Sequence, residues 1–212
     1  IGGLCCGGLL AKAGKKVLIL EAHSKPGGAA HGFQKSGYNF ESGPSLWSGI
    51  GTWPTTNPLG QVLKALNQKV ELIKYQDWNV QIPEGNYNIG VGSKGFINQI
   101  NSISGKEAIK EWENFIQVIK PIGEAANAIP LIALSQNKET IFQLLRRSKT
   151  LLKHLKSFKY LGGSFGELVD NSLKDPFLRN WVDLLCFLIS GLSKDETNAA
   201  AMATLFNDWF KT

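Results

Sequence analysis

The sequence is poor in cysteine, with only three among its 212 residues. Cys5 and Cys6 are adjacent, Cys186 lies far along the chain, and no Cys-x-x-Cys or Cys/His spacing occurs. This pattern supports neither a disulfide framework nor a zinc site, so we expect no metal centre. A chain without structural disulfides suits a reducing compartment.

Long apolar runs are also missing. The most apolar stretch, Trp181 to Leu192, is too short to cross a bilayer and contains Asp183. We therefore expect no transmembrane helix. A hydrophobic content of 43% is nevertheless ample for a packed core.

A starting methionine is absent, since the chain begins at Ile1 on a glycine-rich run and ends at Thr212 just after an apolar, aromatic segment. We expect a fragment of a longer protein, with any targeting peptide upstream. The net charge of +6 is compatible with nucleic acid, an anionic membrane surface or a phosphate-bearing ligand.

The first 21 residues suggest a dinucleotide-binding unit. Ile1 to Ala13 predicts a helix, and Val17 to Leu20 predicts a buried parallel strand. Gly3 fits the last glycine of a G-x-G-x-x-G fingerprint, with Gly2 beside it and Gly7 four residues on. Glu21 follows the strand, where an acid binds the ribose hydroxyls. A truncated fingerprint is equally typical of a glycine-rich helix packed on an arbitrary strand.

A glycine pair after Glu21 helps to distinguish which dinucleotide cofactor is bound. Pro26-Gly27-Gly28 would let the backbone approach the pyrophosphate closely, and such a pair after the ribose acid favours FAD over NAD. Further on, Gly37 to Ser45 predicts a short strand with a tight turn, and Val70 to Ile89 predicts a hairpin around Pro83 to Asn86. After Gly95 the sequence becomes helical, and three S-x-x-E capping boxes, at Ser104, Ser164 and Ser193, predict helix starts.

These motifs resemble a known family. The stretches GGLCCGGLLAKAGKKVLILEAHSKPGGAAHGF and GYNFESGPS are similar to the N-terminal part of the phytoene desaturase and carotenoid isomerase flavoproteins, most closely the carotenoid isomerase-like branch. The likeness is strong over roughly the first 45 residues and looser beyond, for example at KDPFLRNWVDLL. Amine oxidases of the wider superfamily usually have Gly-Gly-Arg where this chain has Gly28-Ala29, which argues against that activity.

The resemblance implies an FAD site and a polyene substrate. The positions that match cofactor-binding residues of the family are Gly2, Gly3, Gly7, Glu21, Gly27, Gly28 and the Gly43-Pro44-Ser45 turn. Family members place a first strand before Ile1 and a second flavin-binding segment near the C-terminus, so we expect this fragment alone to bind FAD poorly. The catalytic residues stay unknown.

Lys138 to Tyr160 predicts one basic amphipathic helix. Its apolar arc contains Ile141, Leu144, Leu145, Leu151, Leu152, Leu155 and Phe158, and a separate stripe contains Arg146, Lys149, Lys153 and Lys156. Two readings stay open: an ordinary helix with its apolar arc on the core, or a helix in the interface of an anionic membrane. Nucleic acid is not expected, because no binding module accompanies the charge.

Other single residues carry weaker signals. His23, His31 and His154 have no identifiable partner in the sequence, although His31 follows the glycine pair closely enough to approach a flavin. The tryptophans fit a polyene tunnel or, by default, packed cores. Asp175-Pro176 predicts the start of a helix.

The sequence therefore predicts an α/β fold: a partial Rossmann-like FAD-binding unit over residues 1–60, a small β segment over 61–100 and a mostly helical substrate or membrane-facing region over 101–212. The family resemblance implies FAD-dependent cis–trans isomerisation of carotenoids. A desaturase-type FAD oxidoreductase and a non-catalytic escort of prenylated partners remain alternatives. The resemblance also implies a location at the periphery of a membrane, on the cytoplasmic side or in a plastid.

Overall fold

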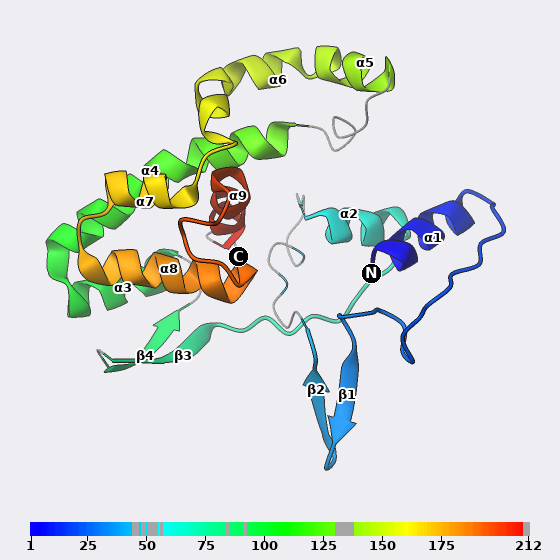
Figure 1. The fold of residues 1–212 in the computed structure, drawn as a ribbon, viewed down its shortest axis with the longest axis horizontal. Coiled ribbons are helices and arrows are strands. Elements are labelled where there is room, and N and C mark those ends of the chain that lie inside the picture. The colour runs from blue at the N-terminus through cyan, green and yellow to red at the C-terminus, as the bar shows by residue number, and fades with distance from the viewer. Residues whose placement is uncertain are drawn as a thin grey trace. The chain divides into compact units, whose positions relative to one another are not determined.

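A computed structural model describes residues 1–43, 47, 50, 55, 57–83, 85–90, 93–129 and 138–209, apart from the side chains of Ser93, Lys94 and Gln143. It is a mixed α/β structure, as predicted, and divides into two compact units, Ile1–Lys74 and Tyr75–Thr212 (Figure 1). The division into three regions at residues 60 and 100 stays a prediction.

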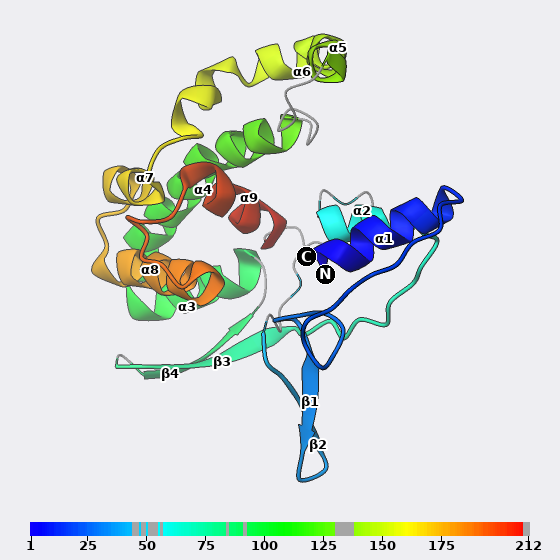
Figure 2. The same ribbon diagram turned by 45° about the vertical axis from the view of Figure 1, so that its right-hand side comes forward.

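The first unit begins with the predicted helix, α1 (Gly2–Lys12). It runs beside α2 (Pro58–Ala65), as Figure 2 shows, and the ammonium of Lys12 donates to the backbone oxygen of Ala65. α2 starts with Pro58, and the side chain of Asn57 caps it by accepting from the amide of Leu59 at 2.9 Å.

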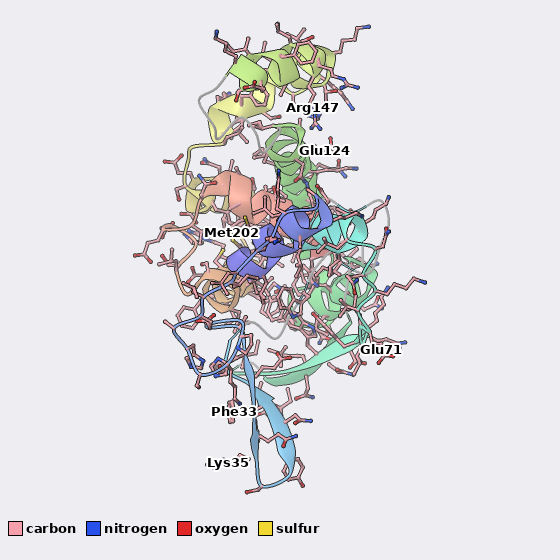
Figure 3. The ribbon with its side chains drawn as sticks, turned by 90° about the vertical axis from the view of Figure 1, so that its right-hand side faces the viewer. Phe33, Lys35, Glu71, Glu124, Arg147 and Met202 are labelled. Carbon is pink, nitrogen blue, oxygen red and sulfur yellow. The ribbon has the colours of Figure 1, made fainter. Side chains whose placement is uncertain are left out.

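A hairpin follows in the same unit. β1 (Gly32–Lys35) pairs antiparallel with β2 (Tyr38–Glu41), and Figure 3 labels Phe33 and Lys35 on β1. The turn residues Ser36 and Gly37 have φ values of 53° and 82°, the signs of a type I′ turn. Sequence reasoning predicted β2 but missed β1.

The predicted parallel strand from Val17 to Leu20 was wrong. The segment has no strand assignment, and Leu18 and Leu20 are 82% and 85% exposed. A strand needs a neighbour for its backbone hydrogen bonds, and in the described part of this unit β1 and β2 bond to each other instead.

The second unit begins with the predicted hairpin. β3 (Asp77–Ile82) pairs antiparallel with β4 (Gly85–Gly90), and Ile82 lies opposite Gly85. The residues that face the helices on this hairpin include Ile89, which is 2% exposed. The hairpin therefore forms one wall of the core.

Helices make the rest of this core. They are α3 (Ser93–Ile103), α4 (Gly105–Ala128), α7 (Phe165–Ser172), α8 (Pro176–Ser190) and α9 (Ala199–Trp209). α4 carries the predicted apolar face, with Trp112, Phe115 and Ile119 buried. α9 packs against α4, and the side-chain amide of Asn207 donates to the backbone oxygen of Lys120 at 2.9 Å.

The three capping boxes had different outcomes. Ser164 caps α7 by accepting from the amide of Gly166 at 3.0 Å. Ser104 precedes α4 but makes no capping bond; its hydroxyl donates to Asp175 at 3.2 Å. Ser193 and Glu196 do bond to each other, but no described helix begins there. Asp175 caps α8 as predicted, accepting from the amide of Leu178 at 2.9 Å.

The single helix predicted from Lys138 to Tyr160 was also wrong. The segment forms α5 (Lys138–Arg146), α6 (Ser148–Lys153) and a 3₁₀ helix, η2 (Leu155–Tyr160). At Arg147 and His154 the backbone amides bond three residues back, which tightens the turn. His154 and Ser157 are buried, and this bend brings η2 against α4. No helix among the described residues is long and apolar enough to cross a membrane.

Candidate nucleotide-binding site

α1 comes close to the following segment at Gly7, and not at Gly3, which the sequence placed as the last glycine of the fingerprint. A Cβ on Gly7 would lie 2.6 Å from Cδ1 of Ile19 and 3.4 Å from a methyl of Val17. α1 therefore packs directly on the segment that leads to Glu21. At Gly3 the same test gives an ordinary contact of 4.0 Å with Ile19, and at Gly2 nothing lies within 4 Å.

Glu21 is exposed and its carboxylate faces backbone amides. Its Oε1 accepts from the amide of His23 at 2.9 Å. This bond is the main cause that lowers the pKa of Glu21 below its usual value, with smaller contributions from the charge of His23 and from the amides of Ala22 and Gly27. The carboxylate is therefore ionised at neutral pH, as a hydrogen-bond acceptor for ribose hydroxyls must be.

The glycine pair forms a loop that other residues would strain. Gly27 has a φ of 114°, and a Cβ there would lie 2.7 Å from the backbone oxygen of Ala30. Gly28 has a φ of 62° and nothing within 4 Å of its own Cβ position. The loop therefore has backbone open to a ligand at Gly28, and Gly27 makes the turn possible.

The structure brings this loop against the end of β2. A Cβ on Gly43 would collide with the backbone of Ala29, and the amide of Ser42 donates to the backbone oxygen of His31 at 3.1 Å. The two glycine-containing segments that the sequence singled out thus lie side by side. Pro44 and Ser45, the rest of the predicted turn, lie outside the described residues.

Two histidines that had no identifiable partner in the sequence have one in the structure. The rings of His23 and His31 lie 4.5 Å apart, and Nδ1 of His31 lies 2.7 Å from the backbone oxygen of Gly28, to which it must donate. The hydroxyl of Ser42 lies 3.1 Å from the same ring. Sequence reasoning missed Ser42, whose only signal was its place beside the Gly43-Pro44-Ser45 turn.

These residues fit the adenosine half of a dinucleotide cofactor. They provide a helix that starts with small residues and an ionised acid that follows this helix. They also provide a tight glycine loop, in which a Cβ on Gly27 would collide with the backbone of Ala30. Within the part of the chain that the structure describes, no group of three His, Cys, Asp or Glu side chains gathers to hold a metal.

The remaining candidates belong to the second unit. Arg146, Lys149, Lys153 and Lys156 are all exposed. Trp112 and Trp181 are 1% and 2% exposed and fill the core, which was the default prediction for the tryptophans.

Comparison with known proteins supports the N-terminal motif. Residues 1–64 match the NAD(P)-binding Rossmann-like domain. This match covers the helix, Glu21, both glycines of the loop and the β1–β2 hairpin. The start of the chain is therefore similar to nucleotide-binding domains of Rossmann type.

Curated relatives cover much more of the chain. It is 26% identical over 198 residues to prolycopene isomerase of Daucus carota, which covers 93% of this chain and 32% of the relative. The predicted resemblance to carotenoid isomerases is confirmed. The chain is also 29% identical over 188 residues to all-trans-retinol 13,14-reductase of Danio rerio, covering 84% of this chain and 30% of the relative. No solved structure was found to match.

The human all-trans-retinol 13,14-reductase is 55% identical over a shorter stretch of 42 residues, which is 20% of this chain and 7% of the relative. The chain spans about a third of the length of the longer-matching relatives. Their names associate this group with isomerases and reductases of polyenes.

Proposed function

We propose that the chain forms the nucleotide-binding part, and some of the substrate-binding part, of an FAD-dependent cis–trans isomerase of carotenoids. One observation carries this proposal. The similarity to prolycopene isomerase extends over 93% of the chain, so it includes both compact units and not only the dinucleotide motif. A shared motif alone would support no more than cofactor binding.

FAD is the proposed cofactor because the ribose acid is followed by a glycine pair. In this proposal α1 offers its first amides to the pyrophosphate, Glu21 accepts from the ribose hydroxyls, and Gly28 leaves room for the cofactor beside the backbone. The full proposed set is Gly2, Gly3, Gly7, Glu21, Gly27, Gly28, Gly43, Pro44 and Ser45. The flavin, when bound, supplies redox chemistry that the side chains of this chain lack.

The proposed substrate is a carotenoid or a similar water-insoluble polyene. The protein would bind it, orient one double bond and exclude water, while the isomerisation leaves the mass of the substrate unchanged. We assign no catalytic residue. Because such a polyene resides in a bilayer, the proposal places the enzyme at a membrane surface, on the cytoplasmic side or in a plastid. The names of the plant relatives describe those proteins as chloroplastic.

A second candidate is the saturation of a polyene double bond. It is favoured by the 29% identity to the zebrafish retinol reductase over 84% of the chain. The desaturase and escort alternatives enter as outcomes of the test.

The test is to incubate the full-length protein, reduced flavin and a poly-cis carotene in liposomes without oxygen, and to resolve the products by chromatography and mass. An all-trans product of unchanged mass supports the isomerase. A gain of two hydrogens supports the reductase, and a loss of two under oxidising conditions supports the desaturase; either result contradicts the isomerase. An unchanged substrate with a protein free of flavin supports the escort.

A further inference from the structure

The segment Lys138–Tyr160, here called the arm, exposes large apolar side chains. It consists of α5, α6 and η2, which lie at one end of the second unit (Figures 1 and 2). Its most exposed apolar residues, each 62–67% exposed, are Ile141, Phe142, Leu145, Leu152 and Leu155. An isolated exposed leucine is ordinary, but five such residues within one short segment call for a partner.

The arm also holds a concentration of positive charge. Besides Lys138, whose charge is balanced in the sequence by the neighbouring Glu139, its cations are Arg146, Arg147, Lys149, Lys153, Lys156 and Lys159, and all six are exposed. From Thr140 to Gly166 the sequence contains no acid. The chain has 23 Lys and Arg against 17 Asp and Glu, so its excess of six positive charges equals the charge of the arm.

Within the described part of the chain, no ion pair joins these cations to an acid. Among the described residues, the ion pairs join Lys110 to Glu107 and connect Asp170 and Asp195 with Arg179 and Lys194. None involves a cation of the arm. Figure 3 labels Arg147 at the break between α5 and α6.

Part of the arm is already in contact with the rest of the unit, and the five exposed apolar side chains do not share in that burial. Thr140, His154 and Ser157 are buried, and Leu151 is half-buried. η2 and α6 contact α4. The first alternative, in which the whole apolar arc packs on the core, is therefore wrong for the most exposed residues of that arc.

We propose that the arm docks on an anionic lipid bilayer, with Ile141, Phe142, Leu145, Leu152 and Leu155 entering the interface and the six cations binding lipid headgroups. Apolar insertion and electrostatic attraction together are what hold amphipathic segments at a membrane surface. Long Lys and Arg side chains can lie along the apolar surface and still reach the headgroups.

The combination of charge and exposed apolar surface favours a lipid bilayer over two other possible partners of the arm, a second copy of the chain and nucleic acid. A second copy of the chain would bring six cations against six, which is repulsive. Nucleic acid would satisfy the cations but would leave five apolar side chains in water. A bilayer with anionic headgroups uses both features. The proposal stands without the isomerase activity, and vesicle binding is measured without flavin or carotenoid.

The first test reverses charge. Binding of the full-length protein to vesicles of phosphatidylcholine and phosphatidylglycerol is measured by co-sedimentation. The variant R146E/K149E/K153E/K156E should bind at least about tenfold more weakly, and the parent should weaken between about 0.1 M and 1 M salt. A control variant, K35E/K69E/K106E/K120E, makes the same change in net charge at exposed lysines outside the arm and should retain binding.

The second test removes apolar surface at constant charge. F142S/L152S/L155S should also bind at least about tenfold more weakly. Its matched control, F187S/L188S/I189S, removes side chains of α8 that are 48–60% exposed and should retain binding. All of the replaced residues in both variants are solvent-exposed, so circular dichroism should show unchanged folding.

Three results overturn the proposal. The first is that the arm variants bind vesicles as tightly as the parent. The second is that both control variants lose as much binding as the arm variants. The third is that the parent binds neutral phosphatidylcholine vesicles as tightly as anionic ones. If the parent ignores vesicles and F142S/L152S/L155S converts a dimer to a monomer in sedimentation, the occupant is a second copy instead.

Discussion

Glu21 combines an exposed position with a carboxylate whose pKa is lowered chiefly by the amide of His23. If it accepts from the cofactor's ribose, Glu21→Gln should release FAD about tenfold more readily, because hydrogen bonds to a charged acceptor are stronger than those to an amide. Flavin absorbance after gel filtration measures the retained fraction. Glu41→Gln, at an exposed acid of β2, is the control, and equal retention in the two variants would remove Glu21 from the site.

The same carboxylate predicts a pH dependence. A carboxylate with a lowered pKa stays ionised through the ordinary titration range of glutamate, and its charge is lost only as the pH falls through the lowered pKa. FAD retention by the parent should therefore persist through the ordinary titration range of glutamate and decline only below it. Glu21→Gln should lack this acid-side decline, as followed by flavin release against pH.

Gly27 is held in a conformation that side chains rarely adopt, with a φ of 114°. Gly27→Ala should lower the free energy of unfolding by about 1–3 kcal/mol and loosen the loop that faces Glu21. Gly2→Ala is the contrasting variant, because nothing lies within 4 Å of its Cβ position. Thermal unfolding separates them, and equal melting temperatures would contradict the strained loop.

Cys186 should be chemically inert in the folded protein. Burial raises the pKa of its thiol to about 11, and the thiol is therefore protonated and enclosed at pH 8. Cys6 is exposed. Iodoacetamide labelling followed by mass spectrometry should modify Cys6 and leave Cys186 intact until the protein unfolds. Equal rates at the two thiols would show that the core around α8 opens readily.

At the scale of elements, the same S-x-x-E pattern at Ser104 and at Ser164 precedes two helices that begin with different hydrogen bonds. Ser164 caps α7, whereas the hydroxyl of Ser104 is used by Asp175. Ser164→Ala should therefore cost about 1 kcal/mol, the usual value of an N-cap, and also removes a bond to the backbone oxygen of Asp195. Ser104→Ala should cost less. Denaturant unfolding tests the order, and a larger effect at Ser104 would contradict it.

This pair shows what local sequence can predict. The S-x-x-E pattern at Ser104 correctly marks where α4 begins, but it does not reveal that the Ser104 side chain bonds to Asp175, which lies far along the chain, and makes no cap. The apolar pattern of Val17 to Leu20 likewise predicts a strand, and only the absence of a bonding neighbour among the described residues prevents one. α1, the β3–β4 hairpin and the apolar face of α4 depend on local patterns, and they were predictable.

The candidate site was partly predictable for a similar reason. Glycines and acids at fixed spacings indicate a dinucleotide loop, and the structure brings Gly27, Gly28 and Gly43 into one neighbourhood. The contact between His31 and Ser42 depends on the β1–β2 hairpin, which folds residue 42 back onto residue 31. Because β1 was missed, this contact was not foreseen.

At the scale of the whole molecule, the two units carry separable tasks in our proposal. The Rossmann-type match lies within residues 1–64 of the first unit, and the arm that holds the excess positive charge lies in the second. Loss of flavin and loss of vesicle binding should therefore be independent. Glu21→Gln should bind vesicles like the parent, and R146E/K149E/K153E/K156E should retain its flavin.

The most direct measurement of the central claim is the cofactor dependence of carotene isomerisation. The full-length protein is stripped of bound nucleotide, reloaded with FAD or with NAD, reduced, and given a poly-cis carotene without oxygen. Our account predicts that only the FAD-loaded protein yields an all-trans product of unchanged mass. Equal conversion by the stripped or the NAD-loaded protein, or a product that differs by two hydrogens, would contradict it.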